Sequence, residues 1–419
     1  MSIDKNVPKI RFSGFSGEWK PQTLDQVTDV YDGTHQTPKY TSNGVMFLSA
    51  ENIKTLTSKK YISEDSFKEE FKVYPKKNDV LMTRIGDVGT ANVVDNDDDK
   101  AYYVTLALLK FKYLDPYFLR SSIAAPYVQR DIWHRTLHIA FPMKINMNEI
   151  KRVVVNCPDD LSEACEIGNY FQKLDTLINQ HQQKHDKLNN LKKAMQEKMF
   201  PKAGESVPEI RFEGFSGGWV EIPFPETFSF LSSNTLSRAD LNYDQGKARN
   251  IHYGDILVKF GEVVDAQGAN VPYITSDELV SKLSAAKLQD GDVLFADAAE
   301  DETVGKCVEV TNVGEETVFS GLHTIATRPN HSFATNYFGY YLNSGSFHQQ
   351  LLPLMQGTKV LSISKKSIST VNVKYPDDRL EQERIGQYFH NLDALINQHQ
   401  QQITKLKNIK QACLDKMFV

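Results

Sequence analysis

Cysteine is scarce in this sequence, and no two cysteines are spaced for metal binding. The 419 residues include four cysteines, Cys157, Cys165, Cys307 and Cys413, and no two of them are separated by only two residues. Such close pairs are typical of zinc sites and redox-active disulfides, so we expect neither. A long chain with so few cysteines is typical of a reducing compartment, and we expect a cytoplasmic protein that holds no metal.

Long apolar runs are absent as well. A membrane-spanning helix needs about 20 consecutive apolar residues, and no stretch of this sequence approaches that length. The opening residues, MSIDKNVPKI, contain no apolar stretch, so the sequence predicts no signal peptide. We therefore expect no membrane partner.

The short motifs of common enzyme classes are also missing. The sequence has no G-x-x-x-x-G-K-[ST] phosphate loop, no H-E-x-x-H zinc motif and no G-x-S-x-G nucleophile turn. It has no G-x-G-x-x-G loop after a predicted strand, and no Asn-Pro pair of the kind that an amino-methyltransferase needs. We therefore expect a chain that performs no catalysis itself.

A strong excess of positive charge, the usual mark of a nucleic-acid-binding protein, is not present either. The formal net charge is −5 at pH 7. Residues 1–158 carry 22 Lys and Arg against 19 Asp and Glu, whereas residues 201–376 carry 14 against 21. Any contact between the second segment and nucleic acid therefore requires a local basic patch or a partner protein.

What the sequence does contain is a large internal duplication. Residues 167–200 align with residues 385–418 without a gap, and 21 of the 34 aligned positions are identical. A second repeat stands upstream of each copy, as VPKIRFSGFSGEW at 7–19 and VPEIRFEGFSGGW at 207–219, with 10 of 13 positions identical. The segments between these repeats differ from each other, so the chain alternates a shared framework with variable parts.

The repeats divide the chain into four parts. Each variable segment ends in a Pro-Asp-Asp run, and these residues favour the start of a helix. The pattern predicts two domains, at 1–158 and 201–376, and two helical segments, at 159–200 and 377–419.

Each helical segment has a single apolar stripe. Apolar residues and histidines recur at steps of three or four, close to a heptad pattern. A helix of about 38 residues would be roughly 57 Å long, and it cannot bury such a stripe alone. The predicted seam positions are Leu174, Ile178, His181 and Leu188 in the first copy and Leu392, Ile396, His399 and Leu406 in the second.

We expect the two helices to pack on each other as an antiparallel coiled coil with pseudo-twofold symmetry. Each helix begins at the end of its own domain, so antiparallel packing separates the two domains, whereas parallel packing would crowd them at one end. The seam histidines are interpreted as polar residues that fix the register. The alternative is a metal-binding or pH-sensing pair, although no third ligand is apparent.

Both variable segments predict mixed α/β domains with a strand-rich core. In the first, 78–94 has the pattern of a strand, a glycine-rich turn and a strand, and 117–133 is helical. In the second, 254–264 and 291–310 are interpreted as strand–turn–strand pieces, and 336–354 as helical. The fold class is therefore α/β, with two domains that each precede a long helix.

Together these features resemble the specificity subunit of a type I restriction–modification system. The resemblance lies in the duplicated helical segments, each with LD.LI and a final K..MF, and in the motif VP.IRF.GF.G.W before each variable domain. The pieces TPKYTSNGVMFLSAENI and DVLMTRIGDVG are also similar to that family. Residues 225–250 depart from the pattern, because they have no counterpart of TPKY.

The resemblance implies a non-catalytic subunit that recognises double-stranded DNA. Each variable domain would be a target recognition domain that reads one half of a bipartite sequence. The helix pair would set the distance between the halves and dock two modification subunits, which carry S-adenosylmethionine and methylate adenine. Restriction subunits, which use ATP and Mg, would join them to form the nuclease. The chain itself would bind no cofactor.

Protruding turns offer the candidate DNA contacts, because base contacts need side-chain donors and acceptors and phosphate contacts need Lys, Arg or main-chain amides. In the first domain the candidates are Thr34, His35, Gln36, Thr37, Lys39, Tyr40, Arg84, Arg135 and His138. In the second domain they are Lys259, His323, Gln356, Thr358 and Lys359. An ordinary solvated turn is the alternative interpretation of each.

Two questions stay open at the level of sequence. The motif IRF.GF.G.W is interpreted either as a packing element at a domain edge or as a surface that seats the modification subunit. The alternative function is a scaffold with two protein-binding domains and no affinity for nucleic acid, which the acidic second domain favours. Duplex binding that weakens steeply with added salt would separate the two functions.

Overall fold

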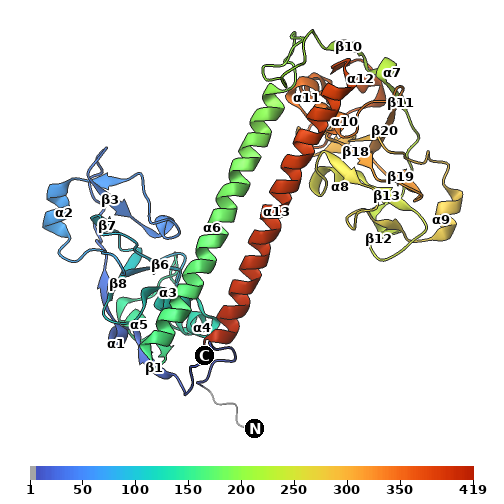
Figure 1. Ribbon diagram of the computed structural model, residues 1–419. Coiled ribbons are helices and arrows are strands. Elements are labelled where there is room, and N and C mark those ends of the chain that lie inside the picture. Colours follow the sequence, from blue (N-terminus) through green and yellow to red (C-terminus); the bar gives the residue numbers. More distant parts are fainter. Residues whose placement is uncertain (1–5) are drawn as a thin grey trace. The chain divides into compact units, whose positions relative to one another are not determined.

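Two compact units make up the computed structural model, which describes residues 6–419. Unit 1 is the chain up to Gln183 together with Gln400–Val419, and unit 2 is Lys184–His399. Two long helices, α6 (Leu161–Lys198) and α13 (Arg379–Met417), each contribute one part to each unit (Figure 1). The two long helices are thereby confirmed, while the four-part division of the chain stays a prediction.

Unit 1 has a strand-rich core that is largely antiparallel. Its strands are β1 (Lys20–Thr23), β2 (Thr28–Asp32), β3 (Val45–Leu48), β4 (Tyr61–Ile62), β5 (Val80–Thr83), β6 (Ala91–Val93), β7 (Lys100–Tyr102), β8 (Leu106–Phe111) and β9 (Val154–Cys157). They form a four-stranded sheet of order β2-β8-β5-β6, a three-stranded sheet β4-β3-β7 and the pair β1-β9. Only the β3–β7 pair is parallel.

Short helices cover these sheets. They are α1 (Leu24–Val27), η1 (Ala50–Asn52), α2 (Glu64–Glu70), α3 (Pro116–Ala124), α4 (Pro126–Arg135) and α5 (Met147–Lys151). The strand–turn–strand prediction for 78–94 is confirmed by β5 and β6, and the helical prediction for 117–133 by α3 and α4. The helix breaks at Ala125, because a residue before proline is driven out of the helical region and Pro126 follows it.

Unit 2 has more strands, arranged mainly in two sheets. A five-stranded sheet has the order β11-β20-β16-β18-β14, and a four-stranded sheet has the order β12-β15-β13-β19. The pairs β10-β22 and β17-β21 complete the unit. The strands are β10 (Val220–Pro223), β11 (Phe228–Phe230), β12 (Leu241–Asn242), β13 (Arg249–Ile251), β14 (Val263–Asp265), β15 (Tyr273–Ile274), β16 (Val293–Ala296), β17 (Ala298–Ala299), β18 (Cys307–Thr311), β19 (Val318–Ser320), β20 (Thr324–Pro329), β21 (Leu361–Ser362) and β22 (Asn372–Tyr375).

The short helices of unit 2 include the predicted helical stretch at 336–354. They are α7 (Phe224–Thr227), η2 (Arg238–Asp240), α8 (Tyr253–Val258), α9 (Asp277–Lys282), α10 (Tyr337–Leu342), α11 (Gly345–Leu351), η3 (Leu352–Leu354) and α12 (Lys365–Ile368). The mixed α/β class predicted for both variable segments is thus confirmed.

One predicted element of unit 2 is wrong. The sequence predicts a strand at the beginning of 254–264, but the structure has helix α8 there and only then β14. The ring of His252 caps this helix, because its Nδ1 accepts a hydrogen bond from the Gly254 backbone N–H at 3.2 Å. Asp255 lies in the first turn, where the positive end of the helix dipole favours a carboxylate. These local signals outweigh the apolar run Ile256–Val258, which by itself suits either structure.

Each copy of the IRF motif holds the start of one long helix. In unit 1, the Arg11 guanidinium donates to both carboxylate oxygens of Glu163, at 2.6 and 2.7 Å, and Glu163 is fully buried. In unit 2, Arg211 donates to both oxygens of Glu381 at 2.7 Å. Such bidentate pairs are strong and specific in geometry. The motif is therefore a packing element in both units, and its role in seating a modification subunit stays a prediction.

A second repeated contact joins α6 to α13 within each unit. In unit 1, the Lys410 Nζ lies 2.5 Å from Asp175 Oδ1, and the other carboxylate oxygen accepts from Arg120 of α3. In unit 2, Lys192 Nζ lies 2.6 Å from Asp393 Oδ1, and the other oxygen accepts from the Tyr340 hydroxyl of α10 at 2.8 Å. The same two positions of the duplicated helix thus supply the interhelical pair twice.

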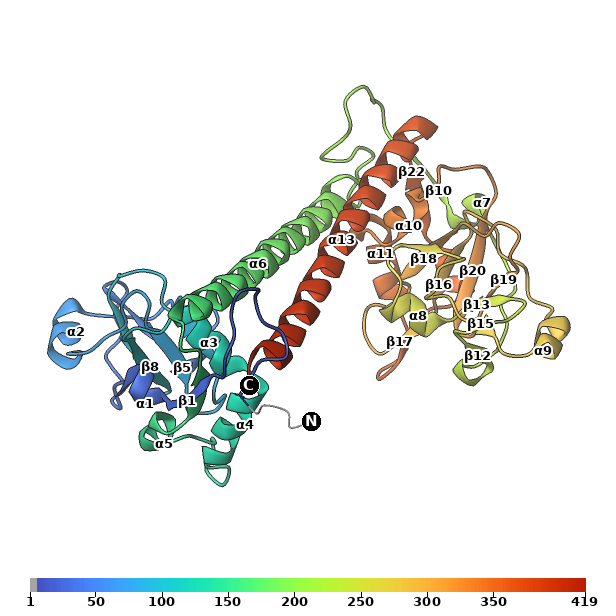
Figure 2. The same ribbon diagram turned by 60° about the horizontal axis from the view of Figure 1, so that its bottom comes forward.

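Glycine permits close contact between each long helix and its neighbouring domain. A Cβ at Gly168 would lie 1.9 Å from Asp115 Oδ1 and 2.9 Å from the Phe118 nitrogen at the start of α3. A Cβ at the equivalent Gly386 would lie 2.7 Å from the Thr335 carbonyl, next to α10. At both glycines, the backbone of the neighbouring domain therefore lies so close to the helix that a Cβ atom would collide with it. In Figures 1 and 2, α3 lies against the beginning of α6.

The predicted seam positions are less exposed than the remaining faces of the helices. Leu174 packs in the same core as Leu414 in unit 1, and Leu392 in the same core as Leu188 in unit 2. Leu174, Leu392 and Ile396 are buried, and Ile178, His181, Leu188, His399 and Leu406 are half-buried.

Unit 2 contains a buried acid whose titration should control stability. Glu309 of β18 accepts hydrogen bonds from the backbone N–H groups of Asn336 (2.6 Å) and Gly339 (2.9 Å). Burial nevertheless raises the pKa of Glu309 to about 7. A raised carboxyl pKa means that the folded state binds more protons than the unfolded state between pH about 4.5 and 7. Unit 2 should therefore lose stability as the pH rises through that window.

We predict that Glu309→Gln flattens this pH dependence. The wild-type free energy of unfolding should fall by up to about 3 kcal/mol more than that of the variant between pH 5 and pH 8, at about 1.4 kcal/mol per pKa unit. Urea unfolding of the full chain at several pH values measures the difference. The exposed neighbour Glu315→Gln is the control and should keep the wild-type profile. Parallel profiles for Glu309→Gln and wild type would show that Glu309 does not titrate in this range.

Candidate nucleic-acid interface

Most of the candidate residues of unit 1 lie along one edge of its four-stranded sheet, the edge formed by the C-terminal ends of β2 and β5. Strands β2 and β5 both pair antiparallel with the central β8, so the two strands point the same way and end at the same edge. Asp32 ends β2, and the loop from Thr34 to Tyr40 follows it. Arg84 follows the end of β5. The fold thus brings together two stretches that are about 50 residues apart in sequence.

Arg84 is buried at this edge and links three segments of the chain. Its guanidinium forms an ion pair with Asp32, and its Nε donates to the Ile145 carbonyl at 3.4 Å. Asp32 also accepts from the ring of His35, at 2.9 Å. With 6% of its surface exposed, Arg84 offers little of itself to a ligand. The contacts it makes position the Thr34–Tyr40 loop instead.

The Thr34–Tyr40 loop is anchored at its beginning and exposed beyond it. The Thr34 backbone N–H donates to the Tyr102 carbonyl at 3.1 Å, and the Thr34 carbonyl accepts from Val104 at 2.9 Å. Tyr40 packs edge-on against Phe47, with ring centroids 5.7 Å apart. The exposed side chains are His35, Gln36, Thr37, Lys39 and Tyr40. The loop therefore presents donors and acceptors from a fixed base.

A short hairpin forms the other side of the same edge. Leu137 and Lys144 pair across it, and Lys144 also forms a bridge with Ile85, next to Arg84. His138 is exposed on this hairpin, and its ring lies against Trp133 with centroids 4.0 Å apart. Figure 2 shows that the segment between α4 and α5, which includes the hairpin, projects from the body of the unit.

Arg135 lies in the last turn of α4 and is already engaged by carboxylates. Its Nε donates to Asp131 at 2.8 Å, and its Nη1 donates to Glu149 at 3.1 Å. About a quarter of the side chain is exposed, at 24%. A phosphate would have to compete with both acids for this guanidinium. Arg84 and Arg135 are therefore the two arginine candidates of unit 1, and both are already paired with acids.

In unit 2, a comparable edge is built from different residues. Asp297 follows the end of β16, and its carboxylate lies 3.0 Å from the ring Nδ1 of His323. A hairpin from Gln356 to Ser362 borders it, because β21 pairs with β17 and the Ile363 N–H donates to the Asp297 carbonyl at 2.9 Å. Thr358 and Lys359 are exposed on that hairpin. His323 and the hairpin candidates are thus brought together at one edge.

Lys259 belongs to a separate cluster, at the end of α8. It lies 3.0 Å from Asp255, which is fully buried and also accepts from Arg238 at 2.8 Å. Its amine stands 4.5 Å from the centre of the Tyr243 ring and hydrogen-bonds to the hydroxyl of Tyr243. Burial lowers the pKa of the neighbouring His252, which favours the neutral ring that accepts from Gly254. The cluster offers two partly exposed cations, Lys259 and Arg238.

Sequence reasoning missed several residues at these surfaces. Asp32 binds Arg84 and His35, and Asp297 binds His323. A single acid at the end of a strand forms no sequence pattern from which these contacts could be predicted. Ile139 and Phe141, at the tip of the hairpin of unit 1, are fully exposed, at 100% and 104%. Their stretch, LHIAF, suits a buried strand as well as a loop, so the sequence carries no signal of this exposure.

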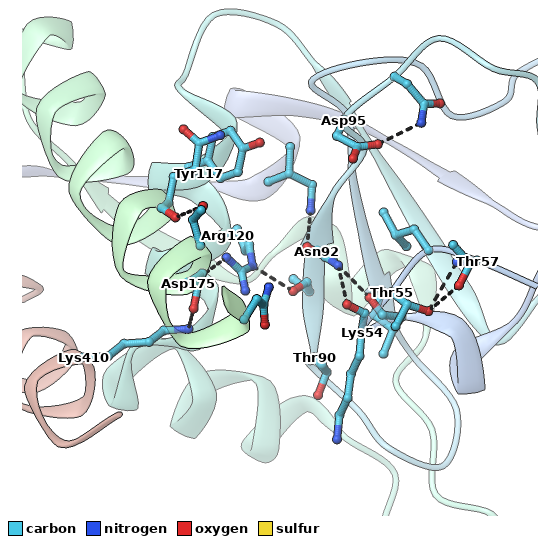
Figure 3. A pocket seen from close by; sticks show the side chains of 18 of the residues that line it. Lys54, Thr55, Thr57, Thr90, Asn92, Asp95, Tyr117, Arg120, Asp175 and Lys410 are labelled. Atoms are coloured by element: carbon cyan, nitrogen blue, oxygen red, sulfur yellow. Dashed lines mark hydrogen bonds and ion pairs between the residues drawn. The ribbon is translucent and has the colours of Figure 1, made fainter. Parts of the chain in front are cut away.

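A polar cavity of about 820 Å³ lies between the domain of unit 1 and its helical part. Figure 3 shows Lys54, Thr90 and Asn92 on the domain side and Asp175 and Lys410 on the helix side. Asn92 donates to the carbonyls of Ile53 (2.9 Å) and Lys54 (3.1 Å), which fixes the rim. The ionisable side chains that line the cavity are Lys54, Asp95, Tyr117, Arg120, Asp175, Lys407 and Lys410.

Two further classes of site find no support in the described part of the chain. Within residues 6–419, no group of three or more His, Cys, Asp or Glu side chains is arranged to hold a metal ion. None of the helices in that range combines the length and apolarity that a membrane span needs.

Comparison with known proteins identifies one family. A family model described as type I restriction modification DNA specificity domain matches residues 245–408. No curated protein is significantly similar in sequence. Among solved structures, the S subunit of a type I restriction–modification system from M. genitalium is similar over 99% of both chains, with a TM-score of 0.59 and 16% sequence identity.

Two more structures are similar at lower scores. A chain from a structure of type I R-M system assembly covers 95% of this chain and 97% of its own length, with a TM-score of 0.49 and 14% identity. The HsdS subunit from Thermoanaerobacter tengcongensis covers 96% of both chains, with a TM-score of 0.41 and 16% identity.

The family match covers most of the second variable domain and most of α13, which is one of the two duplicated helices that carry the resemblance seen in the sequence. The structural similarity to the M. genitalium subunit extends over nearly the whole chain and shows a shared fold. The resemblance is thereby confirmed: at residues 245–408 the chain is similar to the type I restriction modification DNA specificity domain.

Proposed function

We propose that this chain is the specificity subunit of a type I restriction–modification complex and recognises a bipartite sequence in double-stranded DNA. The domain of each unit contacts one half of the sequence. The chain itself is not catalytic: modification subunits with S-adenosylmethionine methylate adenine, and restriction subunits with ATP and Mg cleave. Its own contribution is to select the site and to set the distance between the two halves.

The observation that carries the proposal is one framework, present twice, with a different surface attached to each copy. The Arg–Glu pair, the Lys–Asp pair and the close-packed glycine recur at equivalent positions in the two units. The residues at the strand edges attached to them differ: unit 1 presents the Thr34–Tyr40 loop, and unit 2 presents His323 and the polar tip of the Gln356–Ser362 hairpin. A duplicated frame with unlike surfaces suits a target whose two halves differ in sequence.

We also propose that α6 and α13 pair antiparallel along their length, as a coiled coil with pseudo-twofold symmetry. Support comes from each unit separately. In unit 1, Asp175 near the beginning of α6 meets Lys410 near the end of α13. In unit 2, Lys192 near the end of α6 meets Asp393 near the beginning of α13. A pairing that satisfies both contacts runs in opposite directions, and the seam leucines and isoleucines then share one interface.

Two equivalent docking positions for modification subunits follow from the duplicated motif. The arginine of each motif is engaged by the framework, but the preceding Ile10 and Ile210 remain partly exposed, at 46% and 36%. Each isoleucine also donates its backbone N–H to the end of a long helix, to Lys416 in unit 1 (3.0 Å) and to Lys198 in unit 2 (2.9 Å). One partner surface could therefore bind the same way twice.

The first test separates DNA recognition from a protein scaffold. We predict that Lys39→Gln weakens duplex binding by the complex with its modification subunits and reduces the salt slope by about 1, because one phosphate contact is lost. Lys77→Gln is the matched control, since Lys77 is exposed just before β5, at the opposite edge of the same sheet. Equal effects of the two variants would remove the loop from the interface. A wild-type complex that binds no duplex would favour the scaffold.

A second test asks whether each unit recognises its own half of the DNA sequence. Exchanging residues 220–373 for the corresponding domain of a relative with another target should change one half of the methylated sequence and leave the other half intact. Mapping methylated adenines in a genome that expresses the hybrid with its modification subunits measures this. A change in both halves, or in neither, would contradict the assignment of one half-site to each unit.

A third test concerns the spacing. Inserting seven residues at equivalent central positions of both α6 and α13 adds about 10.5 Å of helix, which should lengthen the tolerated gap by about three base pairs at 3.4 Å each. The same insertion in α6 alone should disrupt the pairing and abolish binding, and this serves as the control. An unchanged gap in a folded, doubly extended protein would argue against the helices as the spacer.

A further inference from the structure

The hairpin of unit 1 between Leu137 and Lys144 ends in an apolar tip that the recognition of base edges does not explain. Ile139 and Phe141 are fully exposed there, and Trp133 and Leu137 beside them are exposed at 57% and 39%. Scattered single apolar residues are normal at a protein surface, but neighbouring large ones at full exposure mark an interaction site. Ile and Phe cannot hydrogen-bond to a base edge, so the tip must act in another way.

Hydrogen bonds hold both arms of the hairpin in place at its base. The Leu137 N–H donates to the Lys144 carbonyl at 2.8 Å, which closes the arms. The Gly86 N–H donates to the Met143 carbonyl at 2.9 Å, and the Ile145 N–H donates to the Arg84 carbonyl at 3.0 Å, which fixes one arm to the end of β5. The His138 ring bonds to the Trp133 carbonyl at 2.9 Å, which fixes the other arm to α4. The apolar tip is thus held in place before any ligand binds.

The surroundings of the tip favour an anionic polymer as its partner. Arg130 and Lys144 are exposed in residues 126–144, and the one Asp of that range, Asp131, is paired with Arg135. The tip shares its sheet edge with the Thr34–Tyr40 loop, whose exposed residues are the candidate base and phosphate contacts. It is also narrow, with two apolar side chains on paired arms. Apolar protein interfaces usually have a broad buried core with a polar rim instead.

We propose that Ile139 and Phe141 form a wedge that inserts between neighbouring base pairs of the DNA and bends it. Proteins that bend DNA use apolar side chains of this kind to unstack a base step, and the bend allows more of the protein surface to reach the duplex. The cost of unstacking depends on the step, so the wedge adds sequence preference at a position without hydrogen bonds. The proposal rests on the DNA-recognition function proposed above.

The equivalent hairpin of unit 2 differs in the residues that the wedge requires. Its tip reads QGTKV, with Val360 as the one exposed apolar residue, at 54%. The polar Thr358 and Lys359 stand where unit 1 has its Ile and Phe side chains. We therefore assign the wedge to unit 1 alone, so that the distortion is confined to the half-site that this unit contacts.

The test uses the complex with its modification subunits and a short duplex that carries the sequence found by methylated-adenine mapping. The variant is Ile139→Ala with Phe141→Ala. The bend is measured by energy transfer between dyes at the two DNA ends, and unstacking by 2-aminopurine fluorescence at each step of the half-site. Both tip residues are fully exposed, so folding should be unaffected. Phe111→Ala is the matched control, because Phe111 is an exposed phenylalanine at the opposite edge of the same sheet.

The double variant should bind the duplex roughly 10- to 100-fold more weakly, lose the bend and the 2-aminopurine signal, and keep the wild-type salt slope, because no phosphate contact is removed. Lys144→Gln should instead reduce the salt slope by about 1, because one phosphate contact is lost, and leave the bend unchanged. Phe111→Ala should behave as wild type.

Three results would overturn the wedge, and they are distinguishable. Wild-type affinity and bend in the double variant would refute it and leave the proposed function intact. Loss of assembly with the modification subunits, measured by size-exclusion chromatography without DNA, would assign the tip to a protein contact instead. A wild-type complex that binds no duplex would refute the proposed function itself, and the wedge with it.

Discussion

The carboxylate of one aspartate in each long helix joins three parts of the structure. Asp175 accepts from Lys410 of the other helix on one oxygen and from Arg120 of the attached domain on the second. Asp393 accepts from Lys192 and from Tyr340 in the same way. Burial, together with the Asp393 carboxylate, raises the pKa of Tyr340, so its hydroxyl stays protonated and donates. The register of the helices and the seating of the domains therefore depend on the same group.

This arrangement separates the contacts that fix the long helices, which must stay constant, from the loop residues at the strand ends, which can vary. The contacts that fix the helices use a few charged residues of the repeats, and each is satisfied within its own unit. The edges that carry the candidate DNA contacts lie at the ends of strands, where loop residues can change without disturbing a core. Arg84 and His323 show the consequence. Arg84 is buried and pairs with Asp32 at the end of β2, whereas His323 is exposed and pairs with Asp297 after β16.

Sequence patterns predicted helices and strands correctly where the pattern extended over many residues, and incorrectly where it covered only a few. The two long helices and the β5–β6 hairpin follow from repeats and alternation over many residues. The stretch at 254–264 contains only a brief apolar run, so the capping contact of His252 decided its conformation. The position of Arg84 in sequence suggests a ligand contact, but Asp32 and Ile145 enclose it, and neither lies within 50 residues of it along the chain.

The sequence by itself determined that one framework occurs twice, that each copy ends in a helix with one apolar stripe, and that two unlike domains are attached to it. These properties are visible because they are periodic or repeated. The tertiary structure decided which side chains are available to a ligand. Burial of Arg84, neutralisation of Arg135 by Asp131 and Glu149, and exposure of Ile139 and Phe141 all arise from residues that meet only when the strands pair, and no local pattern records those meetings.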